Sequence, residues 1–136
     1  LDMWQCPKCK REFSKNNQSH SCVVYPIEKH FQNKDYSKKL FKELVNQIEK
    51  NIGGVKIESL PCCIHLVSGY TFSGVWLLKD RVRLDFRVPY NIESKRIINK
   101  EELSINRKLY YLEIVEEKDI DDELLGWIRD SYFLQN

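Results

Sequence analysis

The 136-residue sequence predicts an α+β fold: an antiparallel sheet of four to five strands with two main helices packed on one face, plus an N-terminal zinc module. Three observations support this prediction. Cysteine and histidine cluster at the N-terminus, residues 35–52 repeat apolar side chains at helical spacing, and residues 55–88 hold short β-branched and aromatic runs separated by brief turns. Parallel strands need a long crossover, so these short connections imply antiparallel pairing. The predicted boundaries are 1–25 for the zinc-binding module and 26–136 for the α+β domain.

The N-terminal array consists of Cys6 and Cys9, two residues apart around a proline, followed by His20 and Cys22. Thiolates and imidazoles in such density are typical of zinc, and four protein ligands complete a tetrahedron without an open position. The predicted cofactor is therefore a structural Zn²⁺ ion rather than a catalytic one. Only one residue separates His20 from Cys22, which restricts the geometry, and His30 is the alternative histidine ligand.

Disulfide bonding is the competing use of the cysteines. Their number is five, which is odd, and Cys62 and Cys63 are adjacent inside an apolar run. The first residues contain no apolar core of a secretory signal. A reduced, cytoplasmic compartment is therefore expected, where clustered cysteines indicate metal. No apolar run approaches the ~20 residues of a membrane helix, so no membrane partner is expected.

The first long helix is predicted from Asp35, as its N-cap, to about Ile52, with Gly53 and Gly54 ending it. Lysine and glutamate occupy the opposite side of this segment. Its apolar side chains fall on one face at helical spacing and are Leu40, Phe41, Leu44, Val45, Ile48 and Ile52.

Four strands follow in quick succession and are predicted at residues 55–58, 62–67, 71–78 and 81–88. The last of these alternates strictly between apolar and polar residues, which is the period of a half-buried strand. One side carries Val82, Leu84, Phe86 and Val88, and the other carries Arg81, Arg83, Asp85 and Arg87.

The remaining elements are a strand at 108–116 and a final helix beginning near Asp121. Asp121, Asp122 and Glu123 place negative charge at the positive end of that helix. Residues 90–104 are polar and lack a clear period, and a short helix at 94–99 is the expectation there.

The segments WQCPKCKREFSKNNQSHSC and DYSKKLFKELVNQIEKNIGGVKIE together resemble an uncharacterised prokaryotic domain-of-unknown-function family. In that family a CPxC...HSC zinc motif precedes a small α+β domain, and the likeness extends over nearly the whole chain. The resemblance implies metal ligands at Cys6, Cys9, His20 and Cys22. It implies no established activity.

Catalytic signatures are weak in this sequence. Cys63 and His65 share one face of a predicted strand, and a thiolate–imidazole pair is a nucleophile signature, but buried cysteine is more often a small apolar side chain. The acidic residues at 121–123 suit a helix N-terminus electrostatically. No glycine loop for phosphate is present, because Gly53 and Gly54 lack the following Lys and Ser/Thr. The sequence therefore favours a non-catalytic role, with a small enzyme as an alternative.

The arginine-bearing side of residues 81–88 is the candidate binding surface. Arg81, Arg83 and Arg87 match the oxygens of phosphates and carboxylates, so nucleic acid or an acidic protein is the predicted partner. An aromatic stretch of Tyr70, Phe72 and Trp76 flanks this strand and is either a base-stacking surface or core. The alternative is a solvated face balanced by acids, in a protein-interaction or structural module. The net charge of +2 by itself favours neither nucleic-acid binding nor a solvated face.

Overall fold

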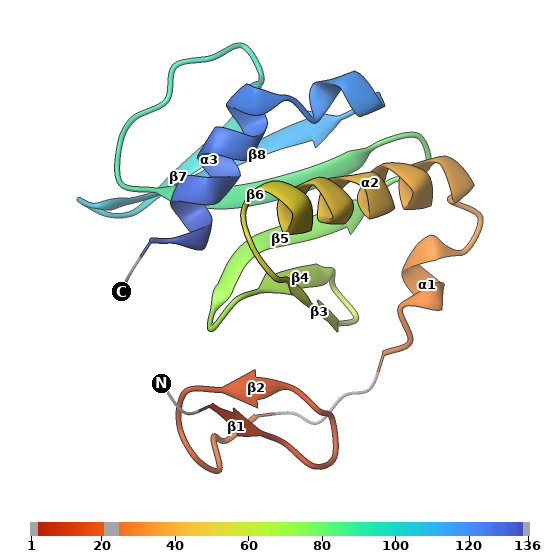
Figure 1. The fold of residues 1–136 in the computed structure, drawn as a ribbon, viewed down its shortest axis with the longest axis vertical. Coiled ribbons are helices and arrows are strands. Elements are labelled where there is room, and N and C mark those ends of the chain that lie inside the picture. Colours follow the sequence, from red (N-terminus) through yellow and green to blue (C-terminus); the bar gives the residue numbers. More distant parts are fainter. Residues whose placement is uncertain (1–2, 21–24, 135–136) are drawn as a thin grey trace.

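The structure is a computed structural model that describes residues 3–20 and 25–134 (Figure 1). Its elements, in chain order, are β1 (Trp4–Gln5), β2 (Glu12–Phe13), α1 (Glu28–Phe31), α2 (Asp35–Asn51), β3 (Lys56–Ser59), β4 (Ile64–Val67), β5 (Thr71–Leu77), β6 (Val82–Val88), β7 (Ile97–Ser104), β8 (Arg107–Ile114), the 3-10 turn η1 (Glu117–Asp119) and α3 (Asp122–Tyr132).

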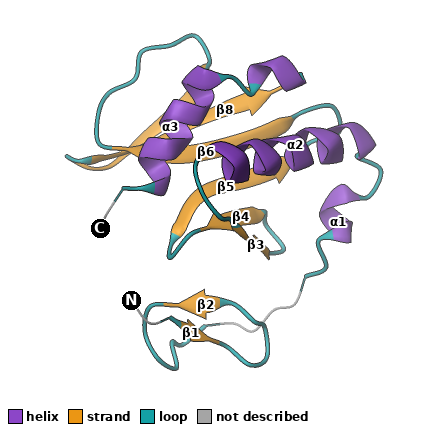
Figure 2. Cartoon of the chain, viewed as in Figure 1, coloured by secondary structure: helices purple, strands orange, loops and turns teal. Residues whose placement is uncertain are grey.

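These elements confirm an α+β architecture. Six strands form one antiparallel sheet in the order β3-β4-β5-β6-β8-β7, and β1 pairs with β2 in a separate two-stranded ladder. Helices α2 and α3 lie next to each other on one face of the large sheet, over β5 and β6 (Figures 1 and 2). The opposite face of the sheet, which these two helices do not cover, is called the open face below.

Helix α2 forms where its apolar periodicity predicts, and Leu40, Phe41, Leu44 and Ile48 are buried on its inner side. Asp35 is the first helical residue rather than the N-cap, which is Lys34. The buried Ser37 donates its hydroxyl hydrogen bonds to the carbonyl oxygens of the β5–β6 turn. Polar side chains recur along this helix. Among the described helices, none combines the length and apolarity needed to cross a membrane.

The prediction of four to five strands and of a short helix at 94–99 is wrong, because the chain forms β7 there. Almost every residue of β7 is exposed, so no alternation of apolar and polar side chains marks it in the sequence. Its pairing with β8 alone creates the strand, through a tight hairpin that joins Ser104 to Arg107. Charged residues such as Lys100 and Glu101 are typical of a sheet edge exposed to water.

The last helix begins as predicted, with Asp121 as its N-cap. The Asp121 carboxylate accepts a hydrogen bond from the backbone nitrogen of Leu124 at 3.0 Å. Trp127 stacks on Phe86 of β6 with ring centroids 5.7 Å apart, which couples the helix to the sheet. The shared core between helices and sheet is fully buried and includes Leu44, Ile48, Ile64, Leu66, Phe72, Val75, Val82, Leu84, Phe86, Leu112, Ile114, Leu124 and Ile128.

Strands β5 and β6 pair only along Val75–Leu77, and beyond that point they separate. Side chains replace the missing ladder. The hydroxyl of Ser131, from α3, donates to the Phe72 carbonyl oxygen at 2.7 Å and accepts from the Arg87 backbone nitrogen at 2.9 Å. Ser73 donates to the carbonyl oxygen of Asp85 at 2.6 Å. One helical serine therefore satisfies a buried acceptor and a donor on two different strands.

We expect Ser131→Ala to lower the free energy of unfolding by about 2–4 kcal/mol, because it leaves both the Phe72 carbonyl and the Arg87 N–H without a partner. Urea denaturation measures the loss. Ser104→Ala, at an exposed position of β7, is the control and should change stability by less than about 0.5 kcal/mol. Equal stability of the two variants would contradict the bridging role.

Candidate metal centre and open sheet face

The N-terminal module is a small hairpin built around its first cysteine pair. Trp4 pairs with Phe13 and Gln5 with Glu12. Between these strands the backbone nitrogen of Cys6 donates to the Arg11 carbonyl at 2.9 Å, and that of Lys10 donates to the Cys6 carbonyl at 2.8 Å. Lys10 adopts a left-handed φ of 65°, which turns the chain back after Cys9. The turn places both cysteine side chains on one side of the hairpin.

Cys6, Cys9 and His20 bring their ligand atoms within 4.8 Å of one another. The Cys9 sulfur lies 3.3 Å from His20 Nε2, and His20 Nδ1 lies 2.6 Å from the Gln18 carbonyl oxygen. This carbonyl fixes the imidazole so that Nε2 faces the sulfurs, as in the outer shell of metal sites. Atoms around one tetrahedral ion stand roughly 3.5–3.8 Å apart, so the donor set fits a metal ion.

Of the other predicted ligands, Cys22 lies outside the described residues. His30 is not part of the cluster, because its Nε2 is 2.7 Å from the Leu60 carbonyl oxygen. An aromatic side chain supports the site: the Phe13 ring centroid is 4.4 Å from that of His20, and Trp4 is 6.0 Å from His20. His20, not the alternative histidine, therefore belongs to the candidate metal centre.

The open face carries an aromatic pair. Trp76 of β5 stands opposite Arg83 of β6, and Tyr111 of β8 stands opposite Asp85. The ring centroids of Trp76 and Tyr111 are 6.0 Å apart. Together with neighbouring residues they surround a cavity of about 170 Å³, which is lined by Trp76, Arg83, Ile98, Asn99 and Tyr111.

The predicted alternation of β6 is confirmed, since all four of its apolar residues are fully buried on the helix side. The arginines emerge on the other side, but two of them share an acid from β8. Glu113 Oε2 lies 3.1 Å from Arg81 Nε and 2.9 Å from Arg83 Nη2. Arg87 donates from Nη1 to the Thr71 carbonyl oxygen at 2.6 Å. Each guanidinium therefore has a partner within the sheet.

Asp85 is the buried acid of the open face and is 7 % exposed. Its Oδ1 accepts a hydrogen bond from the Gly74 backbone nitrogen at 2.6 Å. A Cβ at Gly74 would lie 3.1 Å from the Asp85 carboxylate, a tight contact that the carboxylate could accommodate only by shifting a few tenths of an ångström. Burial raises the pKa of Asp85 above its ordinary value, against the effect of the Gly74 hydrogen bond.

Cys63 and His65 do not form an activated nucleophile. Burial, together with the Cys62 thiol at 3.1 Å, raises the pKa of Cys63 to about 12. Burial also lowers the pKa of His65. Both groups are therefore neutral near pH 7, and a neutral thiol is a poor nucleophile. Asp121 and Glu123 are likewise engaged, because Arg96 Nη1 contacts them at 2.9 and 3.1 Å.

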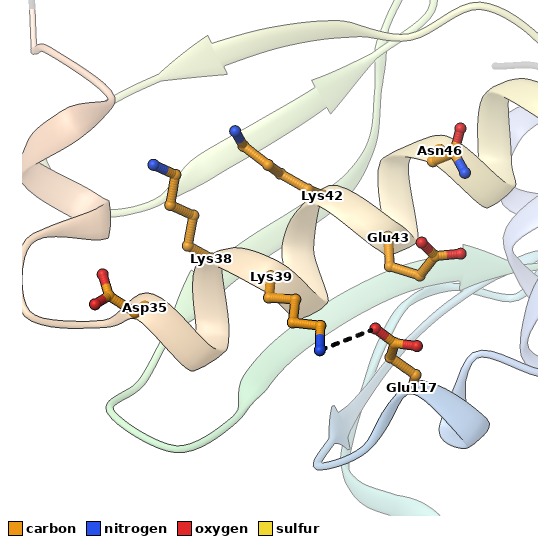
Figure 3. A pocket seen from close by; sticks show the side chains of 7 residues that line it. All are labelled: Asp35, Lys38, Lys39, Lys42, Glu43, Asn46 and Glu117. Carbon is orange, nitrogen blue, oxygen red and sulfur yellow. Dashed lines mark ion pairs between the residues drawn. The ribbon is translucent and has the colours of Figure 1, made fainter.

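A hollow of about 540 Å³ lies along the polar side of α2 (Figure 3). Lys39 reaches Glu117 at 3.8 Å, while Lys38 and Lys42 extend together away from that pair. Its charged groups therefore do not converge on one point, and it offers no constellation for catalysis.

The sequence prediction named Trp76 but missed its partners. Tyr70 and Phe72, predicted beside it, lie on the helix side of the sheet. Phe72 is fully buried, and the Tyr70 hydroxyl donates a hydrogen bond to the Ser131 carbonyl oxygen of α3. Tyr111 and Glu113 fall on the face of the 108–116 strand opposite to its apolar residues. That alternation was the available signal, but only pairing between β6 and β8 places them beside the arginines.

The family model described as "Domain of unknown function (DUF5655)" matches residues 27–135. No curated protein and no solved structure matches the chain.

We expect the full chain to bind about one metal ion, and Cys6→Ser to abolish stoichiometric binding because it removes one of the clustered thiolates. Titration with Co²⁺ reports sulfur ligation through its absorption bands, and elemental analysis gives the stoichiometry. Cys62→Ser is the matched control, since Cys62 is exposed and distant in sequence from the cluster. Retention of the metal in Cys6→Ser would remove this site from consideration.

The raised pKa of Asp85 predicts a pH dependence of stability. The folded state holds this proton more tightly than the unfolded chain, so the contribution of Asp85 is most favourable at acidic pH and declines as pH rises through the raised value. Asp85→Asn lacks this dependence. Urea unfolding from about pH 4 to about pH 8 should therefore show wild type losing stability relative to the Asn variant.

Glu102→Gln, at an exposed position of β7, is the control for general charge effects and should leave the pH profile unchanged. A wild type that instead gains stability over Asp85→Asn with rising pH would mean that the Gly74 hydrogen bond outweighs burial.

Proposed function

The chain belongs to the DUF5655 family of domains of unknown function, and on this premise we propose that it is a zinc-stabilised, non-catalytic module that binds single-stranded nucleic acid on its open sheet face. The observation that carries this proposal is the aromatic pair of Trp76 and Tyr111 beside Arg83. Flat rings on a sheet surface stack with nucleobases regardless of sequence.

The geometry of this surface suits an unpaired base. The cavity is lined by both rings, which contact each other, and Arg83 and Asn99 add a planar guanidinium and an amide to its lining. A base that enters it meets aromatic faces and hydrogen-bonding groups at the same time. A duplex keeps its bases stacked internally, so a single strand is the better ligand.

Electrostatics limit how such a strand is held. Glu113 already pairs with Arg81 and Arg83, so these arginines add less net positive charge to the open face than the sequence indicates. Most of the binding energy must then come from stacking. A shallow dependence of affinity on salt is the consequence, because few counterions are released.

Zinc has a structural part in this proposal. Cys6, Cys9 and His20 supply three ligands, and Cys22, outside the described residues, is the proposed fourth. The module is too short to bury enough apolar surface for its own stability, and bound zinc would supply the free energy that orders it. With all four positions taken by protein atoms, no open coordination site serves a reaction.

Replacement of either aromatic residue tests the function. We expect Trp76→Ala and Tyr111→Ala each to weaken binding of a fluorescent single-stranded oligonucleotide by about tenfold or more, the loss of one stacked base. Anisotropy titration measures the affinity, and a tryptophan fluorescence quench that Trp76→Ala lacks reports stacking on that ring.

Phe133→Ala is the matched control, because this ring is 60 % exposed beyond α3 and lies outside the open face. It should bind like wild type. Absence of binding by wild-type protein at low salt, or equal affinity in all three variants, would rule out the stacking surface.

A further inference from the structure

A second polar cavity lies where the N-terminal module meets the main sheet. It has a volume of about 220 Å³ and opens between the turn of the β1–β2 hairpin and the edge strand β3. The lining residues that carry the argument are Lys10, Arg11, Lys56, Glu58 and Ser59. We propose that this cleft binds a phosphate group, and the proposal stands independently of the stacking surface.

Two buried polar atoms in this cleft have no hydrogen-bond partner among the described residues: Arg11 Nε and Ser59 Oγ. Arg11 Nε is 3.8 Å from the nearest Glu58 oxygen, which is beyond hydrogen-bond range. A buried polar atom without a partner destabilises a folded protein and needs an explanation, and a bound anion is the one that we propose for these two. Arg11 belongs to the module and Ser59 to β3, and both residues line the cleft.

The charge of the cleft favours an anion. Three of the lining residues, Lys10, Arg11 and Lys56, are basic, and one, Glu58, carries a carboxylate. Lys56 Nζ also lies 3.2 Å from a Glu12 carboxylate oxygen, which offsets one of these charges, and 3.3 Å from the Lys10 carbonyl oxygen, so the cleft keeps a net positive charge. The Arg11 guanidinium carbon lies 5.1 Å from the centroid of the Phe13 ring, in a cation–π contact.

Phosphate fits this arrangement better than a carboxylate. A tetrahedral oxyanion accepts hydrogen bonds in several directions, so it can accept from a guanidinium and a hydroxyl together. A planar carboxylate accepts hydrogen bonds chiefly in its own plane and suits this arrangement less well. The phosphate could be free in solution or terminate a nucleic-acid strand, and the two sources share this chemistry.

Calorimetric titration of the metal-loaded full chain with inorganic phosphate at low ionic strength tests the site. Wild type should bind one phosphate saturably, and Arg11→Gln should weaken binding at least tenfold. Ser59→Ala should weaken it severalfold, and Arg11→Lys should retain part of the affinity. The matched control is Arg129→Gln on α3, whose guanidinium contacts the Asn51 carbonyl, and it should bind like wild type.

Metal content and circular dichroism show whether each variant is folded. Should Arg11→Gln lose its metal, Ser59→Ala still decides, because its side chain belongs to β3 and not to the module. No saturable binding by wild type, or unchanged affinity in Ser59→Ala and Arg11→Lys, would overturn the proposal.

A second arm identifies the source of the phosphate. A 5′-phosphorylated trinucleotide that binds more tightly than its unphosphorylated form, with the advantage lost in Ser59→Ala, assigns the cleft to strand ends. Equal binding of the two forms, with inorganic phosphate still bound, assigns it to the free ion. Trp76→Ala should leave inorganic phosphate binding unchanged, so failure of the stacking surface and failure of this cleft give different results.

Discussion

The separation of β5 from β6 beyond Val75 is the constraint on which much of this structure depends. Backbone groups released there are buried and need partners, and Ser131 of α3 supplies them on two strands at once. The helix is thereby fixed to the sheet by polar bonds as well as by apolar packing. On the open-face side of the same gap, the Asp85 carboxylate accepts a hydrogen bond from the Gly74 backbone nitrogen.

This arrangement gives the two faces of the sheet different compositions. Both long helices cover one face of the sheet, so the apolar residues of β6 are buried in the core. The other face is left with residues that the core does not need, among them Trp76, Tyr111 and the arginines. Their partners decide its chemistry: cross-strand pairing with Glu113 neutralises guanidiniums, while the aromatic rings stay accessible.

The N-terminal module meets the sheet at the edge formed by β3. Strand β3 is short and lies at the border of the sheet, and ion pairs from Arg11 to Glu58 and from Lys56 to Glu12 join it to the hairpin. Glu58 is only 7 % exposed, so its pairing with Arg11 matters more than a surface contact would. A metal ion held by Cys9 would therefore also order this junction, because Cys9 and Arg11 lie in one turn.

Local patterns in the sequence determined α2, the alternation of β6, the acidic start of α3 and the clustering of Cys6, Cys9 and His20, since periodicity and ligand spacing act over a few residues. Tertiary structure alone decided the rest. β7 exists because β8 pairs with it, Tyr111 joins Trp76 because β8 lies next to β6, and the cleft lined by Arg11 and Ser59 exists because the hairpin meets β3. Each of these depends on contacts between residues distant in sequence, which no local period encodes.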